Sequence, residues 1–326
     1  MKRDDLNIFI AIFTALVFCW TTSAVAQSSY PTKSIRLIVP VAPAGATDYT
    51  ARLIGQKTGE LLGQSIIIDN RPGASGNIGA EIAARANPDG YTLVMPVTSF
   101  SINPSLYSNL PFDVVKDFTP VVLATSAPLL LVINPSVSAK SVSELVALVK
   151  SKPGELNYAH NGKGTTAHIA GELFKKLAGA NIVDIVYKGG GPSIVDLIAG
   201  RVQIYFSTIP AAIVHVNSRK LRALAVTTQS RFITLPDIPT ISESGIPGFD
   251  VAGWFGIFAP AGTPKSIVHR LNKDINAVLI IPDTREQLAK QGLIPGGGTP
   301  EQLNALLHSE LKRWSALIKE IGLMPN

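Results

Sequence analysis

Short apolar runs alternate with amphipathic stretches along most of the chain. Apolar runs of four to six residues predict strands, and the segments after them carry apolar positions at helical spacing. The predicted strands cover residues 35–40, 65–69, 91–95, 129–133, 156–159, 184–187, 203–206 and 222–226. Strands that alternate with helices in this way indicate an α/β protein with a parallel sheet and helices on both faces.

Several helix starts carry recognisable signals. Residues 48–62 and 77–86 read as helices, and Ser141 with Glu144 forms a capping box at the start of another. At 263–264 and 299–300 a Thr-Pro pair predicts a threonine N-cap with proline at the first helical position. Apolar positions then recur at helical spacing up to residue 321, which predicts a long final helix packed on the core.

The first 26 residues follow a different pattern. Lys2 and Arg3 precede an apolar run over residues 8–20, and an A-V-A triplet ends at Ala26. This is the layout of a secretory signal peptide, which we expect to be cleaved after Ala26. The apolar run is short for a bilayer span, so an uncleaved membrane anchor is the less favoured alternative.

Composition narrows the class of protein. A length of 326 residues predicts about two domains. The single cysteine, Cys19, lies in the predicted signal, so the mature chain has no thiol for disulfides, cysteine-based metal sites or thiol catalysis. The net charge of +6 is scattered, which argues against nucleic-acid binding and favours a mildly basic surface that attracts small anions.

Patterns for catalysis are missing from the sequence. It contains no G-x-S-x-G elbow, no H-E-x-x-H pair and no P-loop. The five histidines are dispersed without the spacing of metal ligands. We therefore predict no catalytic set, no metal and no cofactor.

Glycine-rich turns follow several predicted strands. Gly162 and Gly164 open a helix, so backbone amides lie at the positive end of its dipole, where Thr165 and Thr166 add hydroxyl donors. Such a turn suits an anion. The spacing also fits a dinucleotide fingerprint, but an exported protein rarely meets soluble NAD, so we favour a small anion. A purely structural helix cap is the remaining alternative.

Three further loops share this design. They cover residues 42–48, 71–77 and 187–192, and in the first we expect Thr47 or Asp48 to be the helix N-cap. In open α/β sheets ligands bind at the carboxyl ends of the strands, where such loops lie. Any one loop could be only a turn with its cap, but several in one chain favour a binding cleft.

These loops and turns also carry a family resemblance. It runs in order along the mature chain through residues 38–52, 70–79, 87–93, 162–174, 187–190, 239–248 and 254–264. In these segments the chain resembles the tripartite tricarboxylate transporter substrate-binding proteins, also called Bug or TctC-type receptors. It departs from them at residues 44–46 and 74–76, where small residues replace some of the family's glycines.

The resemblance implies a fold of the periplasmic binding protein type II class, with two doubly wound α/β domains around a central ligand cleft. One domain would comprise residues 27–125 and 252–326, and the other residues 126–251. Ligand between the domains would draw them together like a Venus flytrap, so that closure rather than chemistry is the functional step.

The resemblance further implies a periplasmic receptor for a small carboxylate, such as a di- or tricarboxylate, an amino acid or an aromatic acid. The receptor would act as a monomer, and its partners would be the membrane components of a tripartite tricarboxylate transporter or a sensory pathway. An exported α/β enzyme acting on small organic acids is the alternative function.

The same comparison assigns a set of ligand-binding residues. They are Ala44, Gly45, Thr47, Asp48, Thr98, Ser99, Asn161, Gly164, Thr165, Thr166, Lys188, Gly190 and Ser207. Neutral donors would grip the carboxylate through charge-assisted hydrogen bonds. We expect the Asp48 carboxylate to cap a helix rather than to contact an anion, unless the ligand carries an amino group. Backbone contacts leave the identity of the carboxylate open.

Overall fold

The computed structural model describes residues 30–43, 45–187, 189–320 and 322. The predicted signal peptide and its cleavage site, together with Ala44 and Lys188, lie outside the described residues. The chain divides into two compact units, Met1–Thr32 and Lys33–Asn326. The first contributes only residues 30–32 to the described part, and the architecture below is that of the second.

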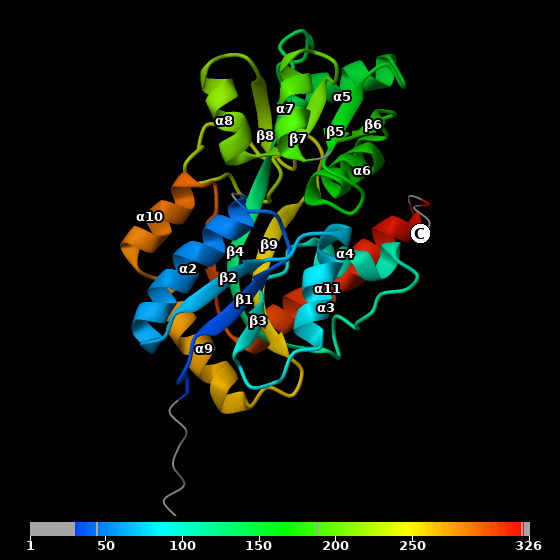
Figure 1. Ribbon diagram of the computed structural model, residues 1–326. Helices are drawn as coiled ribbons and strands as arrows, with labels where there is room; N and C mark the ends of the chain where they lie inside the picture. The colour runs from blue at the N-terminus through cyan, green and yellow to red at the C-terminus, as the bar shows by residue number, and fades with distance from the viewer. Residues whose placement is uncertain (1–29, 44, 188, 321, 323–326) are drawn as a thin grey trace, which may run out of the picture. The chain divides into compact units, whose positions relative to one another are not determined.

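Two groups of strands share one long strand, β4 (Phe118–Ile133) (Figure 1). The first group, sheet A, pairs with the amino-terminal part of β4. Its strands in spatial order are β2 (Ile66–Asn70), β1 (Ile35–Val39), β3 (Thr92–Val94), β9 (Ala252–Pro260), β4 and β10 (Ile294–Gly297). Strands β1, β2 and β3 run parallel, whereas β9 is antiparallel to both β3 and β4.

The second group, sheet B, pairs with residues 129–133 of the same strand. Its strands in spatial order are β8 (Arg222–Val226), β4, β7 (Ile204–Thr208), β5 (Asn157–His160) and β6 (Val183–Val186). Strands β5, β6 and β7 are parallel to one another, and β4 is antiparallel to β7 and β8.

The expected parallel arrangement therefore holds only for β1, β2 and β3 in sheet A and for β5, β6 and β7 in sheet B. Both sheets are mixed because β4 runs from sheet A into sheet B and β9 returns beside it in the opposite direction. Antiparallel strands pair through perpendicular hydrogen bonds, and this pairing spans β4 from Phe118 to Pro128 along β9.

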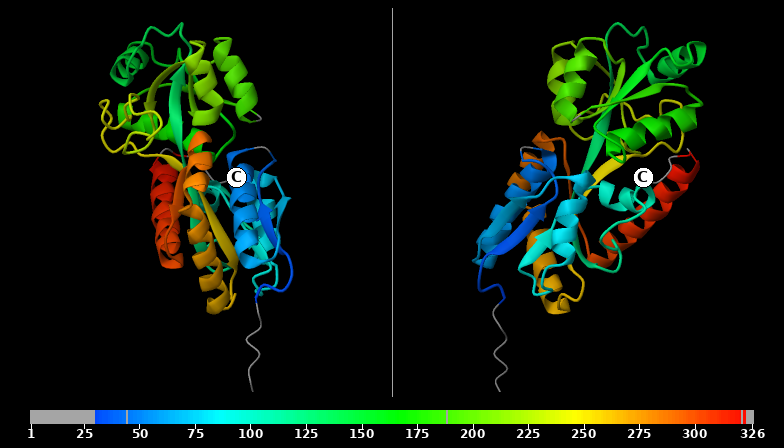
Figure 2. Two further views of the ribbon diagram at one scale, coloured as in Figure 1. Left: turned by 90° about the vertical axis from the view of Figure 1, so that its left-hand side faces the viewer. Right: turned by 45° about the vertical axis from the view of Figure 1, so that its right-hand side comes forward.

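Helices cover both faces of the two sheets (Figures 1 and 2). With sheet A lie α2 (Ala46–Leu62), η1 (Ala74–Gly76), α3 (Asn77–Ala84), α4 (Ser99–Leu106), α9 (Lys265–Leu279), α10 (Pro282–Lys290) and α11 (Pro300–Glu320). With sheet B lie α5 (Val142–Ser151), α6 (Thr166–Ala178), α7 (Gly190–Ile198) and α8 (Ile209–Asn217). Within the described ranges no helix has both the length and the apolar character that a membrane crossing requires.

Each sheet has its own apolar core. Around sheet B the core includes the apolar end of β4 with Tyr158, Phe174 and Phe206. Beside sheet A, Phe100 packs edge-on against Phe118, with ring centroids 5.0 Å apart, in a cluster that also contains Phe258. The helices α4 and α11 contribute buried residues to both cores and so connect them, as β4 does.

The helix starts confirm some sequence signals and correct others. The Glu144 amide donates to Ser141 Oγ at 3.1 Å, and α11 begins at Pro300 with the Gln302 amide donating to Thr299 Oγ1 at 3.3 Å, both as predicted. The expected Thr263 cap is wrong: Pro264 is the N-cap of α9, because the Thr263 hydroxyl donates instead to the Pro260 carbonyl at 2.8 Å.

The expected N-cap of α2 is also wrong. Gly45 takes that position, and neither Thr47 nor Asp48 caps the helix, which begins at Ala46. The Asp48 carboxylate has other partners, since it accepts hydrogen bonds from Arg52 Nε at 2.9 Å and from Asn70 Nδ2 at 3.0 Å.

Candidate functional site

A cavity of about 820 Å³ opens where loops from the two sheets meet. Residues 40–43 and Val97, which follow strands β1 and β3, line it together with Asn161 and Gly189, which come after β5 and β6. These loops continue from the carboxyl ends of parallel strands, the position at which open α/β sheets bind ligands.

The first turns of several helices border the cavity. Six helices contribute residues of their first turns or N-caps to the cavity lining. The helices are α2, α3, α4, α6, α7 and α8, and the residues are Gly45, Thr47, Gly76, Ser99, Thr165, Thr166, Gly190 and Ala211. A helix start carries partial positive charge and amide groups without helical partners, so it attracts anions. Convergence of several such starts makes this cavity suited to a carboxylate.

No charged side chain is found among the described residues that line this cavity. An anion held here would therefore meet amides and hydroxyls rather than ammonium or guanidinium groups. Hydrogen bonds from neutral donors to an ionised carboxylate are still charge-assisted and short, and they do not require a buried countercharge.

Seven of the thirteen predicted site residues line the cavity. They are Gly45, Thr47, Ser99, Asn161, Thr165, Thr166 and Gly190. The structure places these seven at one cavity, although they come from loops of both sheets. Ala44 and Lys188 lie outside the described residues.

The other four predicted residues lie behind the lining. Thr98 Oγ1 accepts the Trp254 amide at 2.9 Å, and the fully buried Ser207 hydroxyl donates to the Thr208 carbonyl at 3.2 Å. Gly164 faces the core, since a Cβ added there would come within 2.8 Å of Leu106 Cδ1. Asp48 is engaged with Arg52, as described above.

Asn161 is fixed in one orientation at the cavity wall. Its Oδ1 atom accepts hydrogen bonds from the Tyr205 hydroxyl at 2.7 Å and from Ser193 Oγ at 3.3 Å. Because the oxygen is occupied by donors, the Nδ2 group is the part of the amide that can donate into the cavity.

Residues that sequence reasoning missed complete the wall. They are the flanking prolines and glycines and a few small side chains, namely Pro40, Val41, Ala42, Pro43, Gly73, Ser75, Gly76, Val97, Gly189, Gly191 and Ala211. Most belong to the three further loops whose glycines were noted in the sequence. Val97 and Ala211 carried no polar signal and could be found only from the fold.

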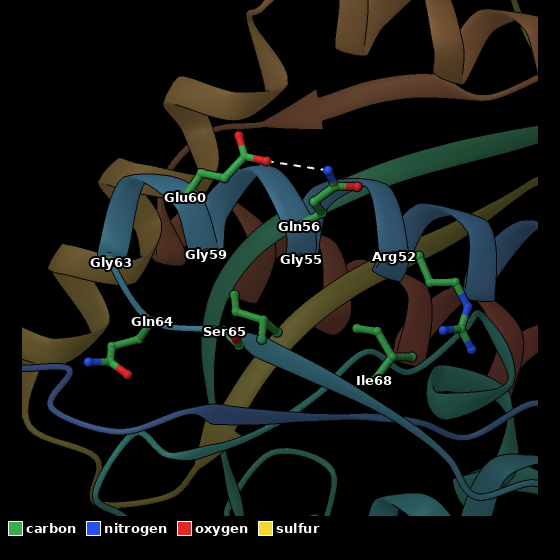
Figure 3. A pocket seen from close by; sticks show the side chains of 10 residues that line it. Arg52, Gly55, Gln56, Gly59, Glu60, Gly63, Gln64, Ser65 and Ile68 are labelled. Atoms are coloured by element: carbon green, nitrogen blue, oxygen red, sulfur yellow. Dashed lines mark hydrogen bonds between the residues drawn. The ribbon is translucent and has the colours of Figure 1, made fainter.

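A second hollow, of about 670 Å³, lies over α2 and the edge strand β2 (Figure 3). Gly55 and Gly59 belong to its lining and let α2 approach β2: a Cβ at Gly59 would lie 2.9 Å from the Gln64 carbonyl oxygen. Gln56 and Glu60 hydrogen bond to each other at 3.3 Å along the helix. Gly55, Gly59 and Gly63 have no side chains to fill this surface, which accounts for the hollow.

Comparison with known proteins indicates one protein family. Residues 50–323 match the family described as tripartite tricarboxylate transporter family receptor. Protein BugT of Bordetella pertussis (strain Tohama I) is 38% identical over 99% of this chain and 99% of its own length.

Solved structures agree with that match. One described as "R. palustris Rpa4515 with adipate" is 37% identical, covers 91% of this chain and 100% of its own, and has a TM-score of 0.83. MatC from Rhodopseudomonas palustris with bound malate is 33% identical over 89% of this chain and 100% of its own, with a TM-score of 0.78.

Proposed function

We propose, from the premise that this chain belongs to the tripartite tricarboxylate transporter receptor family, that it captures a small carboxylate in the 820 Å³ cavity. The observation that carries the proposal is the convergence of helix starts on a cavity whose described lining has no charged side chain. Related proteins with adipate and with malate support a carboxylate as the ligand class.

In this proposal the two sides of the cavity hold the ligand together. Gly45, Thr47 and Ser99 would contact it from elements around sheet A. Asn161 and the Thr165–Thr166 pair, together with Gly190, would contact it from elements around sheet B. A ligand that bonds to both groups favours the conformation in which both reach it, which is domain closure.

The proposal also includes the bounds of the two domains that would close on the ligand. Residues 27–125 with 252–326 would form one domain and residues 126–251 the other. The proposal is supported by the course of β4 and β9, because Thr125 and Phe255 pair within sheet A whereas Leu129 pairs with Thr208 of sheet B.

Receptor function is favoured over catalysis by the state of the serines at the site. The Ser99 hydroxyl donates to the Ser75 carbonyl at 2.8 Å, and the Ser75 hydroxyl lies 3.2 Å from the Tyr107 hydroxyl. A serine nucleophile needs a base within hydrogen-bonding distance. Neither of these partners is one.

Among carboxylates, the lining favours acids without an ammonium group. An amino acid held in the cavity would need a carboxylate or several carbonyls for its ammonium, and the Asp48 carboxylate is already bonded to Arg52 and Asn70. Dicarboxylates, tricarboxylates and aromatic acids make no such demand.

The proposal also covers the localisation, the oligomeric state and the membrane partners of the protein. The protein would reach the periplasm by cleavage after Ala26 and act there as a monomer that delivers its ligand to transporter or sensor components in the membrane. Sequencing of the amino terminus of the protein from a periplasmic extract tests the export, and sedimentation tests the monomer.

Binding is tested on the purified exported protein. A thermal-shift panel of adipate, malate, citrate and benzoate is expected to include acids that raise the melting temperature, because a ligand that binds only the folded state stabilises it. Calorimetry should then give one site, with the acid recovered unchanged. Chemical conversion of the acid, or no stabilisation by any of the four, would overturn the proposal.

A further inference from the structure

Two buried imidazole rings lie directly behind the loop that lines the cavity. His160 ends β5 and His168 lies in α6, and the two side chains are 1% and 2% exposed. Their ring centroids are 4.5 Å apart. The five residues of chain between strand and helix include Asn161, Thr165 and the two glycines of the turn.

Both rings bond to the backbone of this loop. The Gly162 amide donates to His160 Nδ1 at 3.2 Å, and the Gly164 amide donates to His168 Nδ1 at 3.3 Å. The glycines have φ angles of +123° and +74°, a region that other residues rarely adopt. The histidines therefore hold the two glycines at which the loop backbone has a positive φ.

An imidazole nitrogen accepts a hydrogen bond only when it carries no proton. Both Nδ1 atoms are acceptors, so both rings are neutral and carry their proton on Nε2. This assignment agrees with the position of His160 Nε2, which lies 3.4 Å from Asp184 Oδ2 and can donate to it.

We infer that His160 and His168 are positioning residues for the ligand: their neutral rings hold residues 161–166 in the conformation that presents Asn161, Thr165 and Thr166 to the cavity. The assignment of a ligand to this cavity rests on the proposed function, but the positioning of the loop does not.

The charged and titratable groups around the rings are compatible with neutral imidazoles. From α6, Glu172 accepts hydrogen bonds from the Tyr158 hydroxyl at 2.7 Å and from Lys175 Nζ at 2.9 Å, so its charge is compensated. From β6, Asp184 faces His160 and is half exposed to solvent. Burial, which penalises the charged imidazolium, is the main cause that lowers the pKa of His168 to about 4.

The same three side chains could be taken for a metal site. His160, His168 and Asp184 each offer a ligand atom, and these atoms lie within 4.8 Å of one another. A histidine that ligates a metal through Nε2 uses its Nδ1–H as a donor. Here both Nδ1 atoms face amide donors instead, which is the reverse of what a metal requires.

Nitrogen-15 NMR of the imidazoles in the whole protein tests the inference without any ligand. At pH 7, His160 and His168 are expected to show the chemical shifts of the Nε2–H tautomer. Imidazolium shifts, Nδ1–H shifts, or a shift change on adding equimolar Zn²⁺ would overturn it.

Variants then test the consequence for the loop. In His168→Leu, which removes the acceptor, the Gly164 amide should exchange its hydrogen at least about 10-fold faster than in the wild type. His168→Asn places an amide oxygen near the former Nδ1 and should retain most of the protection. His269→Leu, a change at an exposed histidine of α9, is the control and should leave the exchange unaltered.

Adipate affinity of the same folded variants completes the test. His168→Leu is expected to bind adipate about 10-fold more weakly than His168→Asn. If the wild-type protein binds none of the four acids of the panel, the proposed ligand class fails, whereas the tautomers and the exchange rates still decide the positioning role. Equal Gly164 exchange in His168→Leu and wild type would overturn that role.

Discussion

The Asp48 carboxylate lies 2.9 Å from Arg52 Nε, one helical turn further along α2, and is therefore held along the helix rather than across the cavity. Asn70 Nδ2 adds a second donor at 3.0 Å. The one acidic residue predicted for the site is thus occupied by protein partners.

Succinate is therefore expected to bind at least about 10-fold more tightly than aspartate, which differs by one ammonium group. The reason is that a buried ammonium without a partner costs well over 1 kcal/mol. Isothermal titration of both acids against the same protein preparation makes the comparison. Equal or tighter binding of aspartate would show that an acceptor for its ammonium exists in the cavity.

Asn161→Asp should abolish tight binding of succinate, with a loss of at least about 100-fold at pH 7. The change keeps the shape of the side chain but replaces the donating Nδ2 with a second oxygen, which repels the ligand carboxylate. Circular dichroism should show the wild-type fold. Undiminished affinity would remove Asn161 from the site.

Tyr205→Phe should have a milder effect, about a 5-fold loss of succinate affinity. The tyrosine hydroxyl bonds to Asn161 Oδ1 at 2.7 Å, and without it the amide can rotate away from its donating orientation. Ser193→Ala, which removes the longer bond of 3.3 Å, provides the matched comparison and is expected to lose less.

Gly45→Leu should block the cavity without harming the fold. Gly45 lines the cavity and has a φ of −89°, and a Cβ added there meets no heavy atom within 4 Å, so a larger side chain fits without a clash of its Cβ. We expect an unchanged melting temperature in the absence of ligand and at least a 10-fold loss of succinate affinity.

Gly59→Ala, on the same helix, should lower the stability of the fold without weakening the binding of succinate. Its Cβ would lie 2.9 Å from the Gln64 carbonyl oxygen, so we expect a loss of about 1–3 kcal/mol in the free energy of unfolding. Succinate affinity of the folded protein should not change. A loss of affinity in both variants would mean that distortion of α2, rather than blockage, weakens binding.

The free energy of unfolding should fall as the pH is lowered from 6.5 to 4. The pKa of His168 is lowered from 6.5, the value of a solvated imidazole in the unfolded chain, to about 4 in the folded protein, so in this window the unfolded chain binds a proton that the folded chain does not. Stability therefore rises with pH here, with a span of about 3 kcal/mol from this group, and is complete above pH 6.5.

Urea unfolding of wild type and His168→Asn between pH 4 and 7.5 measures this contribution. The two proteins share their other titrating groups, so the difference between the curves isolates His168. The asparagine variant should lose about 3 kcal/mol less than the wild type across the window. Parallel curves would mean that His168 does not titrate abnormally.

Most elements were predictable because their signals are local. Every strand expected from an apolar run was found within one or two residues, except that the run at 129–133 is the end of a much longer strand. The sequence concealed the rest of β4, because Pro120 and Pro128 interrupt it and proline is a poor strand former. Proline also hid α4, which contains Pro104.

The site was predictable only to the extent that backbone features mark it. Glycines and threonines at helix starts signalled Gly45, Thr165 and Thr166 in advance. The orientation of Asn161 depends on Tyr205, which lies on another strand, and no local pattern announces such a contact. His160 and His168 looked dispersed because eight positions separate them, yet a turn at the end of β5 brings their ring centroids to 4.5 Å from each other.

The position of β9 in sheet A has a consequence for folding kinetics. It lies between β3 and β4 and pairs with both, so these two strands are connected in one sheet only after β9 has formed. Val122 pairs with Ile257 across more than 100 residues of chain, a contact whose loop-closure entropy makes it slow to form. Sheet B, by contrast, is complete once residue 226 has been synthesised. A chain still emerging from the ribosome can therefore pair the strands of sheet B first, whereas sheet A must wait for β10, which ends at residue 297.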